Sequence, residues 1–263
     1  MPKRTAQARR PPRLTVLLAR EAPLGVVLRR GPSKLVRLVI WNRDTDKFKP
    51  GSWFKGRIYG ERSDVSPDGR HLIYFALAGV AWAVPATGGT WTAISRLPSL
   101  KASALWGQGD TWSGGGFFLS NNSFWLESDD KTFLIRDNSG LRRETYGPKL
   151  QYRSREERDG WVGARTPGAI LEKGIRNGWI LRRLGWKGSY ELEQPGECKI
   201  NFPGWEWADW DRNRLVWVED GCICTAGIGA NKLGSIRTLY DFNGMAPPKT
   251  RPPAQTRKWE ASN

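Results

Sequence analysis

The hydrophobic residues of this chain fall in short runs, which polar and glycine-rich segments separate. Between Leu35 and Trp41 the residues alternate, so that Val36, Leu38 and Ile40 lie on one face of an extended chain. Further short runs, rich in β-branched and aromatic residues, predict strands at 53–59, 91–94, 117–119, 123–126, 131–136 and 178–184. We therefore expect an all-β chain with a polar loop at 42–51 and less than about one-tenth helix, against the usual third.

The clearest turn signal is Ser66-Pro67-Asp68-Gly69. Pro67 presets the first central position of a type I turn, Asp68 suits the second, and Gly69 supplies the positive φ that follows. Leu72–Phe75 then forms an apolar and aromatic run, as a buried strand does. The stretch predicts a hairpin: strand, turn, strand.

A second stretch, Ala208–Val218, repeats this order of small residue, aspartate, turn, arginine and apolar run, two residues shorter. Asn213 stands where the turn needs a left-handed residue. Asp64 and Asp209 precede the two turns at matching positions. We expect both carboxylates to hold the backbone of the turn by hydrogen bonds.

Ser66–Phe75 resembles the repeat of the WD40-like β-propellers of the TolB type, and Asp209–Val218 resembles a diverged copy. In that family the turn joins two strands of one propeller blade. The resemblance implies a β-propeller-like fold of about four to five blades of short antiparallel strands, regular or irregular. It implies no chemistry, because propellers host many unrelated functions.

Composition along the chain predicts one domain at 14–245 between two flexible ends, and the resemblance implies that this domain is β-propeller-like. Met1–Arg13 is rich in proline and arginine and is expected to be a flexible basic arm. Residues 246–263 are expected to form a flexible tail rich in the same two residues. No run of 18 apolar residues predicts a membrane span, and the first apolar run is too short for a signal-peptide core. Three cysteines without framework spacing fit a reducing compartment, so we expect a cytoplasmic protein.

The chain offers few residues for catalysis. His71 is the one histidine, which removes most metal sites built on several histidines, and no phosphate-binding loop motif is present. We therefore predict a protein that is not an enzyme and has no metal and no cofactor. The formal net charge of +16 is high. It leaves open an alternative function as an accessory protein that contacts nucleic acid.

Another alternative is a carbohydrate-binding or carbohydrate-active protein. Trp205, Glu206, Trp207 and Asp209 combine flat rings for stacking with carboxylates that accept hydroxyl protons. In a regular strand Trp205, Trp207 and Asp209 share one face. The same alternation buries tryptophan between sheets, and that structural interpretation is the favoured one.

The favoured function is binding of a protein partner or assembly through loops at one rim. The longest expected loops are Asn42–Ser52, Pro85–Thr90 and Gly107–Gly116. Trp112 lies in the glycine-rich loop and is the predicted anchor, with folding back over the sheet edge as its alternative. The charge-dense stretch 150–159, a short helix or exposed loop, adds three candidate partner-binding residues: Arg153, Arg155 and Arg158.

Overall fold

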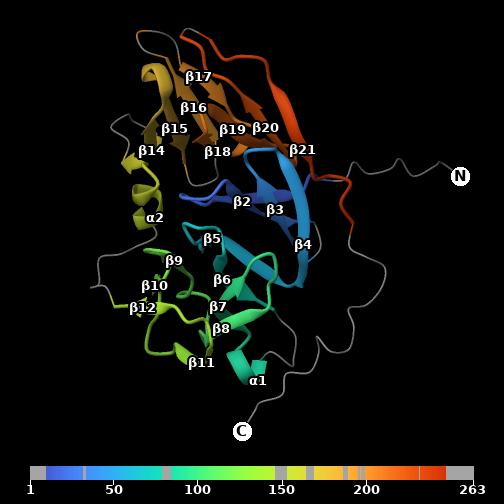
Figure 1. The fold of residues 1–263 in the computed structure, drawn as a ribbon, viewed down its shortest axis with the longest axis vertical. Helices are drawn as coiled ribbons and strands as arrows, with labels where there is room; N and C mark the ends of the chain where they lie inside the picture. Colours follow the sequence, from blue (N-terminus) through green and yellow to red (C-terminus); the bar gives the residue numbers. More distant parts are fainter. Residues whose placement is uncertain are drawn as a thin grey trace, which may run out of the picture.

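The computed structural model describes residues 10–31, 34–78, 84–145, 153–163, 169–185, 189–194, 196, 199–230 and 232–246. Most regular structure in these residues is β-strand, arranged in five sheets (Figure 1). The described helices are short: α1 (Val84–Thr87), α2 (Arg153–Arg158) and the 3₁₀ turn η1 (Arg176–Gly178). The prediction of an all-β chain with little helix is confirmed. Within the same residues, no helix has the length and apolar character that crossing a bilayer requires.

Two of the sheets are antiparallel meanders of four consecutive strands. Sheet A contains β1 (Arg13–Leu18), β2 (Leu24–Arg30), β3 (Leu35–Asn42) and β4 (Lys47–Lys55). Sheet E contains β18 (Trp205–Asp211), β19 (Arg214–Glu219), β20 (Cys222–Ala226) and β21 (Arg237–Asp241). Tight turns join most of these strands, while the longer segment 227–236 joins β20 to β21.

The other three sheets lie between sheets A and E in the sequence. Sheet B contains β5 (Arg57–Val65), β6 (His71–Leu77), β7 (Thr90–Arg96), β8 (Ala102–Gly107) and β11 (Phe133–Asp137). Sheet C contains β9 (Gly116–Phe118), β10 (Ser123–Leu126) and β12 (Arg142–Glu144). Sheet D contains β13 (Val162–Gly163), β14 (Ala169–Gly174), β15 (Ile180–Leu184), β16 (Ser189–Glu193) and β17 (Lys199–Phe202).

Apolar side chains join neighbouring sheets in a fixed order. Separate buried clusters connect sheet D with E, E with A, A with B, and B with C. In the described residues, no such cluster joins sheet C to sheet D. Helix α2 lies at that position instead, beside β9 and β14 on the left of Figure 1. The five sheets therefore follow one another in the order D, E, A, B, C, and α2 stands between the two ends of this series.

The first strands of three sheets meet at the middle of the molecule. β1 lies against β5 on one side and against β18 on the other. A Cβ atom on Gly60 would overlap the side chain of Thr15, so the missing side chain lets β1 and β5 approach closely. These strands line the central cavity described below.

The predicted hairpin is confirmed. β5 and β6 are joined by the turn, and Gly69 has the positive φ of 72° that the sequence demanded. The hydroxyl oxygen of Ser66 accepts hydrogen bonds from the backbone N–H groups of Arg70 and His71. The second predicted turn is also confirmed, with Arg212 and Asn213 both at positive φ between β18 and β19.

Three boundaries predicted from the sequence are wrong. Residues 42–51 are not one polar loop, because β4 begins at Lys47 and protects its exposed edge with lysines and Pro50. Residues 53–59 are not one strand, because Gly56 at φ 148° divides them between sheets A and B. The loop expected at Pro85–Thr90 begins inside α1 and ends in β7.

The predicted flexible ends fall mostly outside the described residues. Positions 1–9 of the basic arm and 247–263 of the tail are not described. Arg13, the last residue of the expected arm, already pairs with Arg30 as the first residue of β1.

Candidate functional site

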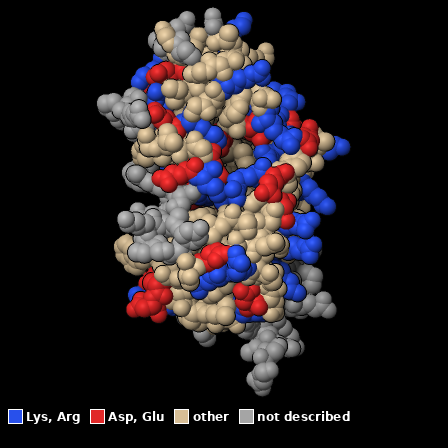
Figure 2. All heavy atoms as spheres, turned by 60° about the vertical axis from the view of Figure 1, so that its left-hand side comes forward, with Lys and Arg blue, Asp and Glu red and all other residues tan. Residues whose placement is uncertain are grey.

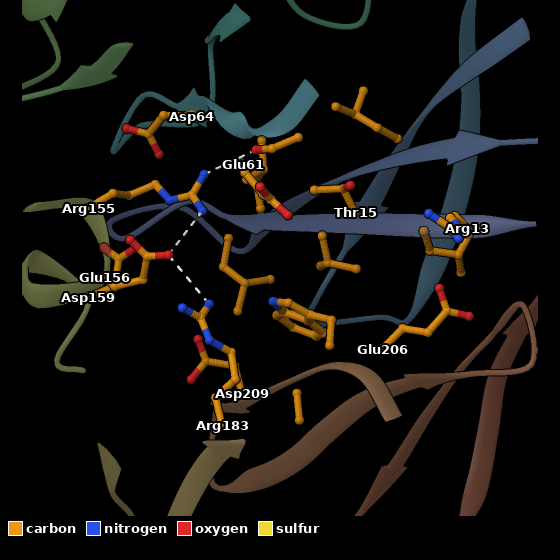
Figure 3. Close-up of a pocket in the computed structure, with 18 of the residues that line it drawn as sticks. Arg13, Thr15, Glu61, Asp64, Arg155, Glu156, Asp159, Arg183, Glu206 and Asp209 are labelled. Carbon is orange, nitrogen blue, oxygen red and sulfur yellow. Dashed lines mark hydrogen bonds and ion pairs between the residues drawn. The ribbon is translucent and has the colours of Figure 1, made fainter. Parts of the chain in front are cut away.

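A cavity of about 1420 Å³ lies where β1, β5, β18 and α2 meet. Figure 3 shows its lining, with Thr15 near the middle and Arg13 and Asp64 toward opposite ends. Eleven basic and seven acidic side chains line it. In Figure 2 the molecule is turned so that the side with α2 comes forward. Basic side chains gather across the middle of this face, next to acidic ones. The two ends of the cavity differ in how these charges are paired.

At the α2 end, Arg158 and Asp64 form a buried ion pair. The Arg158 guanidinium donates from Nη1 and Nη2 to the two carboxylate oxygens of Asp64, at 2.7 and 3.1 Å. Asp64 also accepts a hydrogen bond of 2.8 Å from the backbone N–H of Phe118 in β9, and its side chain is 2% exposed. Burial alone lowers the pKa of Arg158, but the bonds and charges of Asp64 and Asp159 more than reverse this and raise it. The pair ties α2 to sheets B and C.

Arg155, which precedes Arg158 in α2, extends this network. Its Nη1 donates to the backbone carbonyls of Gly60 and Ser63 in β5. Glu156 lies between Arg155, at 3.8 Å, and Arg183 of β15, at 3.5 Å, as the dashed lines in Figure 3 show. Ion pairs and hydrogen bonds through α2 therefore connect sheets C and D, between which the described residues form no apolar cluster.

Two further acids of β18 are also paired. Lys173 of β14 donates to Asp209 at 2.6 Å, and Arg43 pairs with Asp211. Burial raises the pKa of Asp209, and the charge of Lys173 opposes this shift. Both contacts link sheet E to a neighbouring sheet, and neither leaves a carboxylate available to a ligand.

The opposite end of the cavity is basic and poor in acids. Arg13 of β1 lies directly across from Arg30 of β2 in the antiparallel register, and Arg57 opens β5 beside them. The pKa of Arg30 is lowered, first by burial and then by the charges of Arg57 and Arg13. Glu206 is the nearest acid drawn in Figure 3, and it makes no ion pair within the described residues. Burial raises the pKa of Glu206, while Arg13 lowers it.

The sugar-binding arrangement expected at 205–211 is not formed. A β-bulge between Trp205 and Trp207 shifts the register, so the two rings enter different apolar clusters and do not share a face. Trp205 is 2% exposed and stacked between Phe202 and Trp217, with ring centroids 3.9 and 4.7 Å away. Its ring cannot stack on a sugar, and the structural interpretation of Trp205 is confirmed.

The role expected for Asp64 and Asp209 is also wrong. Neither carboxylate holds the backbone of the turn that follows it. Asp64 accepts from Arg158 and from the backbone N–H of Phe118, and Asp209 accepts from Lys173 and from the backbone N–H of Trp210 within β18. Ser66 and Asp68 hold the first turn instead, through a 2.6 Å bond between their side chains and bonds to Arg70. Side chains inside the turn do the work that the preceding aspartates were expected to do.

The glycine-rich loop between β8 and β9 presents Trp112 to solvent. The Trp112 side chain is 86% exposed, so the alternative in which it folds back over the sheet edge is wrong. Arg62 of β5 donates to the carbonyls of Thr111, Trp112 and Ser113, at 2.9, 3.2 and 3.0 Å. Asp110 accepts from the backbone N–H of Trp112 at 2.9 Å. The loop is therefore fixed from both sides while its aromatic ring remains exposed.

The three arginines predicted beside Trp112 as partner-binding residues lie in α2. Arg155 and Arg158 are committed to contacts within the protein, which favours a structural role for both. The side chain of Arg153 lies outside the described residues. The prediction of a short helix at 150–159 is confirmed by α2, but the helix is packed against the cavity and not exposed as a loop.

Other sequence candidates carry little chemistry. His71 opens β6, as expected, and burial is the first cause that lowers its pKa. Cys222 and Cys224 lie on β20 as free thiols, and Cys198 is outside the described residues. Over the residues that the structure describes, no group of histidine, cysteine and carboxylate side chains could hold a metal ion.

Sequence reasoning missed the basic end of the cavity. Its arginines come from the start of β1, the end of β2 and the start of β5. Each stands at a strand end in the sequence, where a charged residue is ordinary. Only the pairing of β1 with β2 and the packing of β1 on β5 bring them together.

Comparisons with known proteins do not assign the chain to a family. No family model and no curated protein matches it. The structure of an uncharacterized protein from Listeria monocytogenes EGD-e aligns with this chain at 11% sequence identity and a TM-score of 0.34. The alignment covers 89% of this chain and 68% of the Listeria chain. A chain from a study of two prolyl endopeptidases aligns with 87% of this chain, with 10% identity and a TM-score of 0.27. This chain spans only 28% of that endopeptidase chain. At these values neither similarity indicates a shared activity.

Proposed function

We propose that this chain is a non-enzymatic, β-propeller-like binding protein that engages a protein partner through the loop carrying Trp112. The proposal of a propeller rests on five sheets that follow one another beside a central cavity, with the first strands of sheets A, B and E on its wall. Each sheet would then be one blade. The joint through α2 would close the ring with charge where the other joints use apolar packing.

The observation that carries the binding function is the exposed ring of Trp112 on a braced loop. Tryptophan exposes a large apolar surface to water, and folding gains nothing by leaving it there. Because Arg62 and Asp110 already fix the loop backbone, a partner would bury the ring at a small cost in ordering. Tryptophan is also enriched among residues that dominate binding energy. A rigid, exposed ring of this kind suits an anchor that enters a pocket on a partner.

The test compares Trp112→Ala with the matched variant Ile236→Ala. Ile236 is 63% exposed and lies in the segment before β21 of sheet E, away from the Trp112 loop. Each tagged full-length protein captures partners from its native cell, and the recovered partner is quantified by mass spectrometry per folded molecule. Purified partner then gives a Kd for each variant. We expect Trp112→Ala to weaken binding by at least about 2 kcal/mol, as hot-spot residues do.

Stability and self-association are measured on the same samples. The Tm of Trp112→Ala should stay close to that of the native protein, since the ring buries little surface. Equal loss of binding in both variants, or unchanged binding in Trp112→Ala, would contradict the proposal. A partner that proves to be a second copy of the chain would appear as a concentration-dependent dimer in light scattering and would also contradict it.

A further inference from the structure

Three arginines from three strands converge at one end of the central cavity. Arg13 of β1 and Arg30 of β2 are direct partners in the antiparallel register. The Cβ atoms of two residues that lie directly opposite each other in an antiparallel pair are about 5 Å apart. Arg57 is the first residue of β5, and its guanidinium lies over the ring of Tyr59, 4.7 Å from the centroid. All of these side chains line the same cavity, which places three positive charges around one volume.

These charges lack acidic partners within the described residues. Every ion pair of the cavity involves other side chains, at the α2 end or along β18. Like charges directly opposite each other on neighbouring strands destabilise a sheet, and the partial burial of Arg30 adds a cost of desolvation, although Arg13 and Arg57 are exposed. The lowered pKa of Arg30 has these same causes. No ion pair among the described residues offsets the repulsion between Arg13 and Arg30, and an anion bound there would offset it.

The neighbouring acid does not neutralise the cluster. Glu206 lies on β18 across from Arg13, and it forms no ion pair with Arg13, Arg30 or Arg57. Burial raises the pKa of Glu206, while the charge of Arg13 lowers it. A second acid of the cavity, Glu61, lies four residues along β5 from Arg57. The Arg13 end therefore keeps a net positive charge, in contrast to the paired charges at the Asp64 end.

We propose that Arg13, Arg30 and Arg57 form a binding site for a small molecule that carries two or more phosphate groups. A guanidinium presents two parallel N–H donors, a geometry that matches phosphate oxygens, and three such groups match a multiply charged anion better than one carboxylate. The three arginines line a cavity of about 1420 Å³, which admits a compact ligand.

The experiment measures binding of tripolyphosphate to the full-length protein by isothermal titration calorimetry at low and high salt. We expect one tripolyphosphate per chain, with affinity that falls as the salt concentration rises. Arg30→Gln and Arg13→Gln should each weaken binding about tenfold or more. The control variant is Arg176→Gln. Arg176 is exposed, lies in the turn η1 between β14 and β15, and does not line the cavity. Its affinity should match that of the native protein.

Two further readouts keep the proposal falsifiable. Thermal unfolding of Arg30→Gln without ligand should occur at the native Tm or above, because the substitution removes repulsion, while tripolyphosphate should raise the Tm of the native protein more than that of the variant. An equal loss in Arg176→Gln would show that general charge attracts the anion, and the proposal would be wrong. It would also be wrong if tripolyphosphate failed to bind at low salt. If the protein bound oligothymidylate but not tripolyphosphate, and Arg30→Gln abolished that binding, the site would bind a nucleic acid and the proposal of a small ligand would be wrong.

Discussion

The ion pair between Asp64 and Arg158 gives a sharp test of how the fold is held together. Asp64→Asn preserves the size of the side chain and removes its charge. It leaves Arg158, which is 14% exposed, with two guanidinium nitrogens facing an amide in place of a carboxylate. Removing one partner of a buried pair costs about 3–5 kcal/mol. Arg158 keeps a second acid, Asp159, at 2.9 Å, so we expect the lower figure, about 3 kcal/mol.

The measurement is urea unfolding followed by the fluorescence of the 15 tryptophans. If the m-value is unchanged, the urea concentration at the midpoint should fall by about 3 kcal/mol divided by the m-value. In thermal unfolding the same loss corresponds to roughly 6–12 °C for a chain of this size. Arg158→Met should be destabilising as well, because it leaves the nearly buried Asp64 carboxylate with one backbone donor.

The double variant and a surface control decide between a coupled pair and two independent losses. Asp64→Asn combined with Arg158→Met should lose less than the sum of the single losses, since each single change strands the other partner. Glu144→Gln breaks an exposed pair with Arg142, whose side chain is 78% exposed, and should cost within about 0.5 kcal/mol. If Asp64→Asn costs no more than Glu144→Gln, or if the single losses simply add, α2 is not held by this pair.

Two more predictions concern the joints between sheets. Gly60→Ala should lower stability by about 1–3 kcal/mol, because its Cβ would overlap Thr15 on β1, and Thr15→Ala in the same chain should restore part of the loss in urea unfolding. Burial raises the pKa of Asp46, but hydrogen bonds and charge from Arg214, with Trp41 and Arg237 adding to them, lower it below its ordinary 3.8. Asp46→Asn should therefore cost about 1.5–3 kcal/mol at pH 7. The difference from the native protein should shrink as the pH falls below 3.8, and a constant difference down to pH 2 would refute this.

The sequence predicted the elements whose signals are local. Pro67 and Gly69 determine the first hairpin turn by their own φ preferences, and Asn213 does the same for the second. The predicted strand boundaries were wrong where a single residue interrupts the pattern of apolar and polar positions. Gly56 breaks an apolar run that otherwise continues through two sheets. The bulge after Trp205 inserts one residue into a regular alternation and sends the next ring to the other face.

The candidate sites were less predictable, because they depend on contacts between distant parts of the chain. Asp64 and Arg158 are 94 residues apart, and nothing near either one indicates the other. The exposed Trp112 could be proposed from its glycine-rich loop, but the bracing by Arg62, 50 residues away, could not. The same holds for Arg57, which joins Arg13 and Arg30 only because β5 packs on β1. Pairing partners along a single sequence cannot be chosen from residue type alone when 42 residues are basic.

The uneven charge of the cavity follows from how the sheets are joined. In the part of the chain that the structure describes, sheets C and D share no apolar cluster. Charged contacts hold α2 there, and the pairing of Arg158 with Asp64 uses an acid of the cavity at that end. Asp209 is likewise occupied by Lys173. What remains at the opposite end is the pair Arg13 and Arg30, which forms no ion pair with a carboxylate within the described residues. A joint made of ion pairs therefore has a consequence across the cavity. It leaves the positive charge concentrated where β1 begins, and an anion entering the cavity would meet its strongest attraction there.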